Sequence, residues 1–141
     1  MNYSRRDLCL LWPGMIAARA FASGEAVLPS KVYPFQDLPV RGHGENRSRP
    51  VFSGATHTGF HVDLHETNLA PGAQPHPPHH HVHEEVFMIR EGTVEVTLRG
   101  RSSRLGPGSV AYIASNTEHG IRNVGKTHAH YFVMAIGRDP S

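Results

Sequence analysis

The sequence predicts an all-β domain built as an antiparallel barrel or jelly roll. Glycine (14 copies) and proline (11 copies) are plentiful in its 141 residues, as expected for many turns. After residue 22 no apolar run has helical spacing, and several short segments alternate between apolar and polar side chains. Short strands at even spacing, separated by turn residues, are typical of antiparallel barrels. The length suits one domain rather than two.

The first 22 residues have the features of an export signal of the twin-arginine kind. The pair Arg5-Arg6 precedes an apolar stretch from Leu8 to Ala22, and this stretch ends in the small-x-small pattern Ala20-Phe21-Ala22. The stretch is shorter than the roughly 20 apolar residues that a membrane span requires. The alternative is an amphipathic helix that stays in the mature protein. We therefore expect an exported, periplasmic protein with no further membrane segment.

The calculated positive charge of the chain lies largely in this segment. Residues 1–22 contain three of the 14 basic residues and one of the 12 acidic residues, so the remainder has equal numbers of each. A partner with a phosphate backbone requires a basic face. The composition therefore argues against nucleic-acid binding.

The single cysteine, Cys9, excludes an intramolecular disulfide and a C-x-x-C metal site.

Residues 23–57 are rich in glycine, proline and serine and have few alternating runs. They predict an irregular arm with one short strand near 31–35. Three arginines of the arm, at positions 41, 47 and 49, are expected either in a solvated loop or paired with a carboxylate.

From residue 58 the alternation becomes regular, and we expect the barrel to span 58–137, followed by a tail at 138–141. The side chains of Phe87, Ile89, Val94, Val96 and Phe132 are expected in its core. The expected elements are a strand at 60–65, a turn at Pro71-Gly72, an extended segment at 75–78, and strands at 86–90, 94–99, 110–114, 120–123 and 130–136.

Histidine is the most unusual feature of the composition, with 12 copies. His79 and His81 are two residues apart, so an extended chain points both to the same face. Glu85 has the same parity, and His119 arrives from a later strand. Imidazole nitrogens and a carboxylate oxygen on one face suit a divalent first-row metal. The alternative is an exposed loop or a nonspecific metal-chelating tract.

These residues resemble the two motifs of the cupin superfamily. The first motif, Gly-x5-His-x-His-x3-4-Glu-x6-Gly, is matched from Gly72 to Gly92 with one extra residue after Gly72. The second, Gly-x5-Pro-x-Gly-x2-His-x3-Asn, is matched from Gly108 to Asn123, with Ala114 in place of proline and Asn116 in place of glycine. Asparagine tolerates the left-handed conformation that such a glycine often supplies.

The resemblance implies a small single-domain cupin, a conserved barrel of the cupin 2 type with the double-stranded β-helix fold. It also implies that His79, His81, Glu85 and His119 are the metal ligands. His80 has the opposite parity, and a pair formed by His81 and His83 leaves only one residue before Glu85, too few for the motif. Single-domain cupins that resemble this chain are commonly homodimers.

The function expected from this resemblance is that of a metalloenzyme of dioxygenase, decarboxylase or isomerase type, acting on a small oxygenated molecule. The alternative is a non-catalytic periplasmic cupin that binds a metal or a small ligand. Mn²⁺ or Fe²⁺ is favoured, with Ni²⁺, Zn²⁺ and Cu²⁺ as further options, because a protein exported in the folded state can load its metal beforehand.

No general base stands out, and the candidates are Glu66, His61, His65 and Tyr112. His61 and His65 either line the barrel or face solvent.

Overall fold

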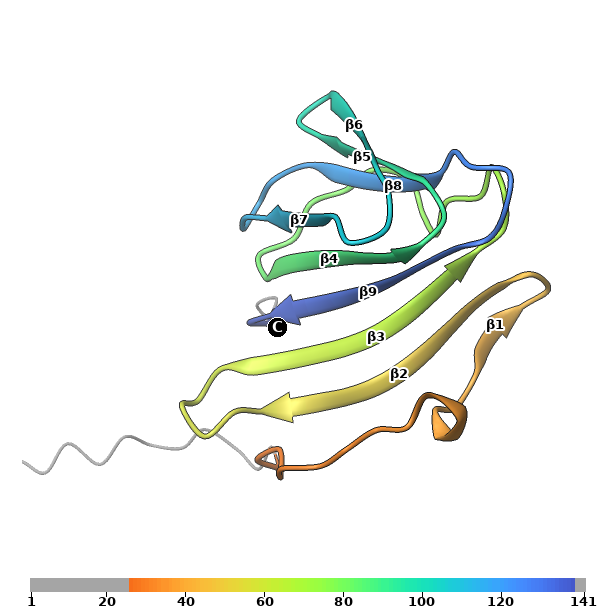
Figure 1. Cartoon of the computed structure of the whole chain (residues 1–141). Helices are drawn as coiled ribbons and strands as arrows, with labels where there is room; N and C mark the ends of the chain where they lie inside the picture. The colour runs from red at the N-terminus through yellow and green to blue at the C-terminus, as the bar shows by residue number, and fades with distance from the viewer. Residues whose placement is uncertain (1–25, 139–141) are drawn as a thin grey trace, which may run out of the picture.

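The computed structural model describes residues 26–138, and nearly all of its regular structure is β-strand. The export segment predicted over residues 1–22 lies outside this range. Figure 1 shows the strands of a large sheet following one another from β7 to β1, with a smaller sheet beside β4 and β7. The elements are η1 (Phe35–Asp37), β1 (Arg41–His43), β2 (Asn46–Ala55), β3 (His61–Leu69), β4 (Glu84–Glu91), β5 (Val94–Leu98), β6 (Arg101–Leu105), β7 (Val110–Ile113), β8 (His119–Asn123) and β9 (Ala129–Ile136).

All strand pairs are antiparallel, and they form two sheets. The larger has the order β1-β2-β3-β9-β4-β7 and the smaller the order β6-β5-β8. Their facing sides share one core, to which the large sheet contributes residues such as Phe87 and Tyr131 and the small sheet contributes Val94 and Val96. This two-sheet arrangement is the jelly roll that the alternating pattern predicted. Within residues 26–138 no helix has the length and apolar character needed to cross a membrane.

The predicted core is correct except at Phe132. Phe87, Ile89, Val94 and Val96 are all buried, but Phe132 is only half-buried. It lies beside Glu66 and Met88 on the outer face of the large sheet. The neighbouring residues Tyr131 and Val133 point inward instead, because side chains alternate along β9.

The expectation of an irregular arm with one short strand near 31–35 is wrong, because residues 31–34 are not in a strand and the arm contains β1 and β2 further along. Residues 35–37 form a short 3₁₀ turn, and β2 pairs with β3 along most of its length. Pro50, a register shift after it, and Gly54 hide the alternation of β2 in the sequence. The pairing with β3 supplies the hydrogen bonds that make this segment a strand.

A buried carboxylate fixes the arm to the outer face of the large sheet. Glu66 is fully buried, with Oε1 at 2.8 Å from His130 Nδ1 and Oε2 at 3.4 Å from an Arg49 nitrogen. The Phe35 ring lies against the guanidinium groups of Arg49 and Arg90, at 4.7 and 5.0 Å. Of the arginines in the arm, Arg49 is therefore the one paired with a carboxylate.

Asn123, at the end of β8, ties the end of β3 to the loop between β8 and β9. Its side chain is fully buried, and Nδ2 donates to the carbonyl oxygens of Leu69 and Thr127 at 2.9 and 2.8 Å. Its Oδ1 accepts the Gly125 N–H at 2.9 Å. Every hydrogen-bonding group of this amide except one acceptor lone pair is therefore used, which explains the polar residue in this position.

Candidate metal centre

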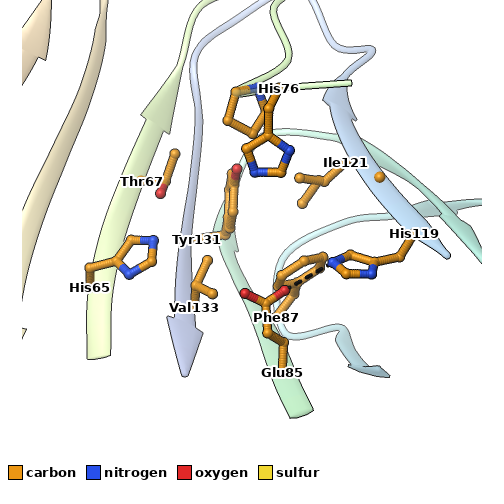
Figure 2. A pocket seen from close by; sticks show the side chains of 11 residues that line it. His65, Thr67, His76, Glu85, Phe87, His119, Ile121, Tyr131 and Val133 are labelled. Atoms are coloured by element: carbon orange, nitrogen blue, oxygen red, sulfur yellow. Dashed lines mark hydrogen bonds and ion pairs between the residues drawn. The ribbon is translucent and has the colours of Figure 1, made fainter. Parts of the chain in front are cut away.

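The centre lies on the inner face of the large sheet, where β4 approaches the start of β8. Glu85 points inward from β4, and Figure 2 shows its carboxylate directed at the His119 ring. The distance from Glu85 Oε2 to His119 Nε2 is 3.1 Å. The His119 side chain is almost completely buried, with 1% of its surface exposed.

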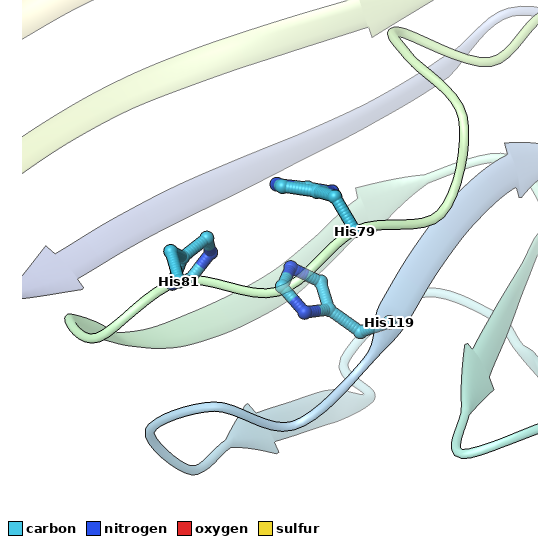
Figure 3. A group of neighbouring side chains, drawn as sticks. All are labelled: His79, His81 and His119. Carbon is cyan, nitrogen blue, oxygen red and sulfur yellow. The ribbon is translucent and has the colours of Figure 1, made fainter.

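His79 and His81 come from the proline-rich segment that precedes β4. The backbones of His79 and His119 form an isolated antiparallel bridge, with N···O distances of 3.0 and 2.8 Å. Residues paired in this way have neighbouring side chains on one face, and the two ring centroids are 4.7 Å apart. Figure 3 shows the rings of His79, His81 and His119 grouped together. One nitrogen from each ring belongs to a set within 4.8 Å of one another, so the group could hold a metal ion.

Backbone carbonyl groups orient two of these rings. His119 Nδ1 lies 2.8 Å from the Thr117 oxygen, and His81 Nδ1 lies 2.7 Å from the His83 oxygen. A carbonyl can only accept, so each Nδ1 must carry the proton, and the neutral ring then presents the Nε2 lone pair to the interior. This is the orientation by outer hydrogen bonds that metal-binding histidines usually have.

The inner atoms of the group have no protein donors to satisfy them. His79 Nδ1 and His81 Nε2 are buried without a hydrogen-bond partner. Glu85 Oε2 lies 3.4 Å from His81 Nε2 as well as 3.1 Å from His119 Nε2. The lone pairs on His81 Nε2 and His119 Nε2 repel the negatively charged Glu85 Oε2 unless a proton or a cation lies between them. Donor atoms bound to one cation at about 2.1 Å are about 3.0–3.4 Å apart, so the observed spacing fits a metal.

Burial keeps His79 available as a ligand. The desolvation of its ring lowers the pKa of His79 below the usual value, and the neighbouring His76, His119 and His81 rings lower it further. The Glu85 carboxylate opposes this shift without cancelling it. A lowered pKa leaves the ring neutral at physiological pH, which is the form that binds metals.

A cavity of about 90 Å³ adjoins this group (Figure 2). Its walls include the apolar side chains of Phe87, Ile121 and Val133. Polar groups come from His65, Thr67, His76 and Tyr131. Burial raises the pKa of Tyr131 well above its ordinary value, so this phenol stays protonated.

Of the four candidate bases, His65 is the one that lines the cavity. Its Nδ1 lies 3.3 Å from Asp63 Oδ1, and the face of β3 that carries it therefore lines the barrel. His61 shares that face but lies near the start of β3, with Nε2 at 3.5 Å from the Ser53 hydroxyl, and does not reach the cavity.

Glu66 and Tyr112 are on the outer face of the sheet, away from the cavity. Glu66 is paired with Arg49 and His130, and Tyr112, which is 55% exposed, donates to Glu84 at 2.7 Å. The assignment of these two residues as candidate bases is therefore wrong. The alternation of side chains along β3 and β7 places each of them opposite to the metal-binding face.

The sequence analysis missed two further histidines of this region. His76 contacts His79 edge-on, with ring centroids 4.2 Å apart, and lines the cavity. His83 stacks on His81, with its Nε2 at 3.6 Å from Glu85 Oε1. The shared parity of residues 81, 83 and 85 was a signal for His83, but the motif spacing had excluded it.

Asn116, which takes the place of glycine in the second motif, has a φ of 57°, the left-handed conformation expected for it. Its backbone N–H donates to the His81 carbonyl at 2.8 Å. This turn therefore holds the segment that carries His81 against the loop before β8.

Comparison with known proteins agrees with this architecture. KdgF from a Halomonas species is 19% identical, with 77% of this chain and 95% of that chain covered and a TM-score of 0.66. The polyketide cyclase RemF from Streptomyces resistomycificus is 21% identical, with 80% and 83% covered and a TM-score of 0.63. A recombinant oxalate oxidase in complex with glycolate is 28% identical over 57% of this chain and 44% of that chain, with a TM-score of 0.51.

A comparison with curated proteins gives no significant match. The Cupin domain family matches residues 65–135, which include both motifs in full and all residues of the candidate metal-binding group. With its jelly-roll topology and this match over half of its length, the chain belongs to the cupin family.

Proposed function

We propose that this protein is a metal-dependent cupin enzyme that acts on a small, oxygen-rich organic anion. The observation that carries the proposal is the grouping of the His79, His81 and His119 nitrogens beside a small cavity, with Glu85 Oε2 at 3.4 and 3.1 Å from those of His81 and His119. The imidazole rings would hold the metal through their neutral nitrogens and the carboxylate through its oxygen. A bound divalent cation would polarise an oxygen of the substrate.

Charge supports an anionic ligand. Three neutral imidazoles and one carboxylate carry a net charge of −1, so a divalent cation leaves the centre positive. The apolar walls formed by Phe87, Ile121 and Val133 lower the local dielectric constant and so strengthen the attraction between this charge and a carboxylate or enolate.

The size of the cavity restricts the ligand. A cavity of about 90 Å³ suits a small ligand better than a bulky one. The glycolate bound to the oxalate oxidase is a two-carbon hydroxy acid, a molecule of suitable size. Among the matched structures, a predicted oxalate decarboxylase from Thermotoga maritima also supports an enzyme acting on a small acid.

His65 is the best candidate for moving a proton. Its ring lines the cavity from β3, while Glu85 and His119 line it from β4 and β8 (Figure 2). Asp63 Oδ1 lies 3.3 Å from Nδ1, and this contact orients the ring. The neutral Tyr131 phenol and the Thr67 hydroxyl would orient the substrate by hydrogen bonds.

The test is turnover of two- and three-carbon oxygenated acids, including oxalate and glycolate, by protein loaded with Mn²⁺ or Fe²⁺. Activity that disappears on chelation and returns with metal supports the proposal. His65→Ala should lower kcat by about 10²–10⁴-fold, as for loss of a general acid or base. His61→Ala, a histidine on the same strand face outside the cavity, is the matched control. Stoichiometric ligand binding without product would instead favour a binding protein.

The preference for Mn²⁺ or Fe²⁺ rests on the proposal that residues 1–22 are a twin-arginine signal, because a protein exported in the folded state can bind its metal before export. Cell fractionation with elemental analysis of the native protein tests both the periplasmic location and the metal. Light scattering in solution tests whether the protein is a homodimer.

A further inference from the structure

The two oxygens of Glu85 face different histidines. Oε2 faces the inner group, at 3.1 Å from His119 Nε2 and 3.4 Å from His81 Nε2. Oε1 faces His83, at 3.6 Å from Nε2 of that residue. A carboxylate whose oxygens point in two directions can bind a cation on either side.

His81, His83 and Glu85 form a second set of donors. One donor atom from each lies within 4.8 Å of the others, as in the inner group. The rings of His81 and His83 are stacked, with centroids 3.5 Å apart and planes inclined by 6°. Both Nε2 atoms lie near the Glu85 carboxylate, at 3.4 Å from Oε2 for His81 and 3.6 Å from Oε1 for His83, where one cation could contact both.

Exposure decreases along the row of ligands from the surface to the interior. The exposed fraction of the side chain is 19% for His83, 14% for Glu85, 9% for His81 and 1% for His119. His83 is therefore the most exposed of these four ligands and His119 the least, while His79 is partly buried, as His81 is.

We infer that His81, His83 and Glu85 form an uptake site, which captures the divalent cation before it moves to His79 and His119. This inference rests on the proposed metal-dependent function. His81 Nδ1 is occupied by the His83 carbonyl, so His81 has only Nε2 to offer and serves one position at a time. During the transfer His81 and Glu85 keep their contacts with the cation, and it exchanges His83 for the two inner imidazoles. It is never released to solvent.

The rate of Co²⁺ binding to the apo protein, followed by stopped-flow absorbance, tests the uptake site. His83→Ala should slow association by about tenfold or more, the usual scale for losing one partner of a metal site. Dissociation should slow by the same factor, because an intermediate on the pathway changes both rates and leaves the affinity of the inner site as it was. His80→Ala, an exposed histidine in the same run, should bind at the wild-type rate.

A double variant, His79→Ala with His119→Ala, isolates the outer position. It should keep weak binding of one Co²⁺, and adding His83→Ala should abolish it. Circular dichroism confirms that each variant is folded. Equal association rates in wild type and His83→Ala, or a weakened affinity with unchanged association, would overturn the uptake site alone. Failure of the wild type to bind Co²⁺ would overturn the metal centre itself.

Discussion

The Nε2 atom of His119 lies 3.1 Å from Oε2 of Glu85, although the two residues are 34 positions apart in the chain. His119 Nδ1 already donates its proton to the Thr117 carbonyl, so the neutral ring directs a lone pair at the carboxylate. This contact is repulsive until a proton or a metal ion occupies the space. Several properties of the protein should therefore depend on what that occupant is.

Removing this imidazole should remove the metal. We expect His119→Ala to lower the affinity for Mn²⁺ by more than about 100-fold, since outer partners of metal ligands alone cost 10–100-fold. Isothermal titration calorimetry with Mn²⁺ measures the effect. His80→Ala should bind as the wild type does, and stoichiometric metal retained by His119→Ala would refute the ligand assignment.

Metal binding should stabilise the folded protein. The unfolded chain cannot bring His79, His119 and Glu85 together, so the ion binds mainly the native state. At a free concentration one hundred times the Kd, the gain is about 2.7 kcal/mol. Calorimetric scans should show a Tm several degrees higher with Mn²⁺ than with chelator. In His119→Ala the two scans should coincide.

Glu66 should matter for stability and not for metal binding. Truncation by Glu66→Ala leaves the positive charge of Arg49 without its partner beneath Phe35. The loss of a buried pair typically costs about 3–5 kcal/mol, and the partial exposure of Arg49 places this case at the lower end. Urea unfolding measures the loss. Tyr112→Phe, on the same outer face, should change stability far less, and a large change in Mn²⁺ affinity in either variant would contradict their outward placement.

Gly92 and Gly108 should respond differently to alanine. Both have positive φ, of 80° and 82°, which costs an alanine about 1–2 kcal/mol. At Gly92 a new Cβ would also lie 2.7 Å from Ala129 Cα and the His128 oxygen, whereas Gly108 has open space. Overpacking adds about 1–3 kcal/mol. Urea denaturation should therefore rank Gly92→Ala below Gly108→Ala, and equal losses would argue against the close approach.

Tyr131 should make the fold sensitive to alkali. Burial raises the pKa of its phenol above the ordinary 10.0, so above pH 10 the folded state keeps a proton that the unfolded state loses. Stability then falls with rising pH, by about 1.4 kcal/mol per pH unit from this group. Tyr131→Phe should unfold with a shallower pH dependence between pH 10 and 11. Identical slopes would show that the phenol ionises in the folded protein.

The sequence predicted the barrel well where side chains alternate clearly. Residues 94–99 and 130–136 have such a pattern, and they form β5 and β9. The strand β6, with the sequence Arg-Ser-Ser-Arg-Leu, was not predicted because its residues are almost all polar and it is an exposed edge. Its strand conformation comes from hydrogen bonds to β5, which no local pattern encodes.

The approach of His79, His81 and His119 to one another, and of Glu85 to His81 and His119, agrees with the motif spacing. The part played by His83 did not follow, because the motif spacing excluded it although it has the parity of His81 and Glu85. The orientation of His65 was also left open. Both faces of β3 carry polar and apolar residues, and only the position of the second sheet distinguishes them.

The buried amide of Asn123 sets a limit on how long the folded chain can last. Slow hydrolysis of an asparagine amide replaces its NH₂ group by an oxygen, and here that oxygen would face the carbonyl groups of Leu69 and Thr127, with nothing to donate to either. The end of β3 and the loop after β8 would then be pushed apart by a negative charge with no counter-ion among these contacts. Chemical ageing at one position would thus loosen the barrel end while leaving the genetic sequence and every metal ligand unchanged.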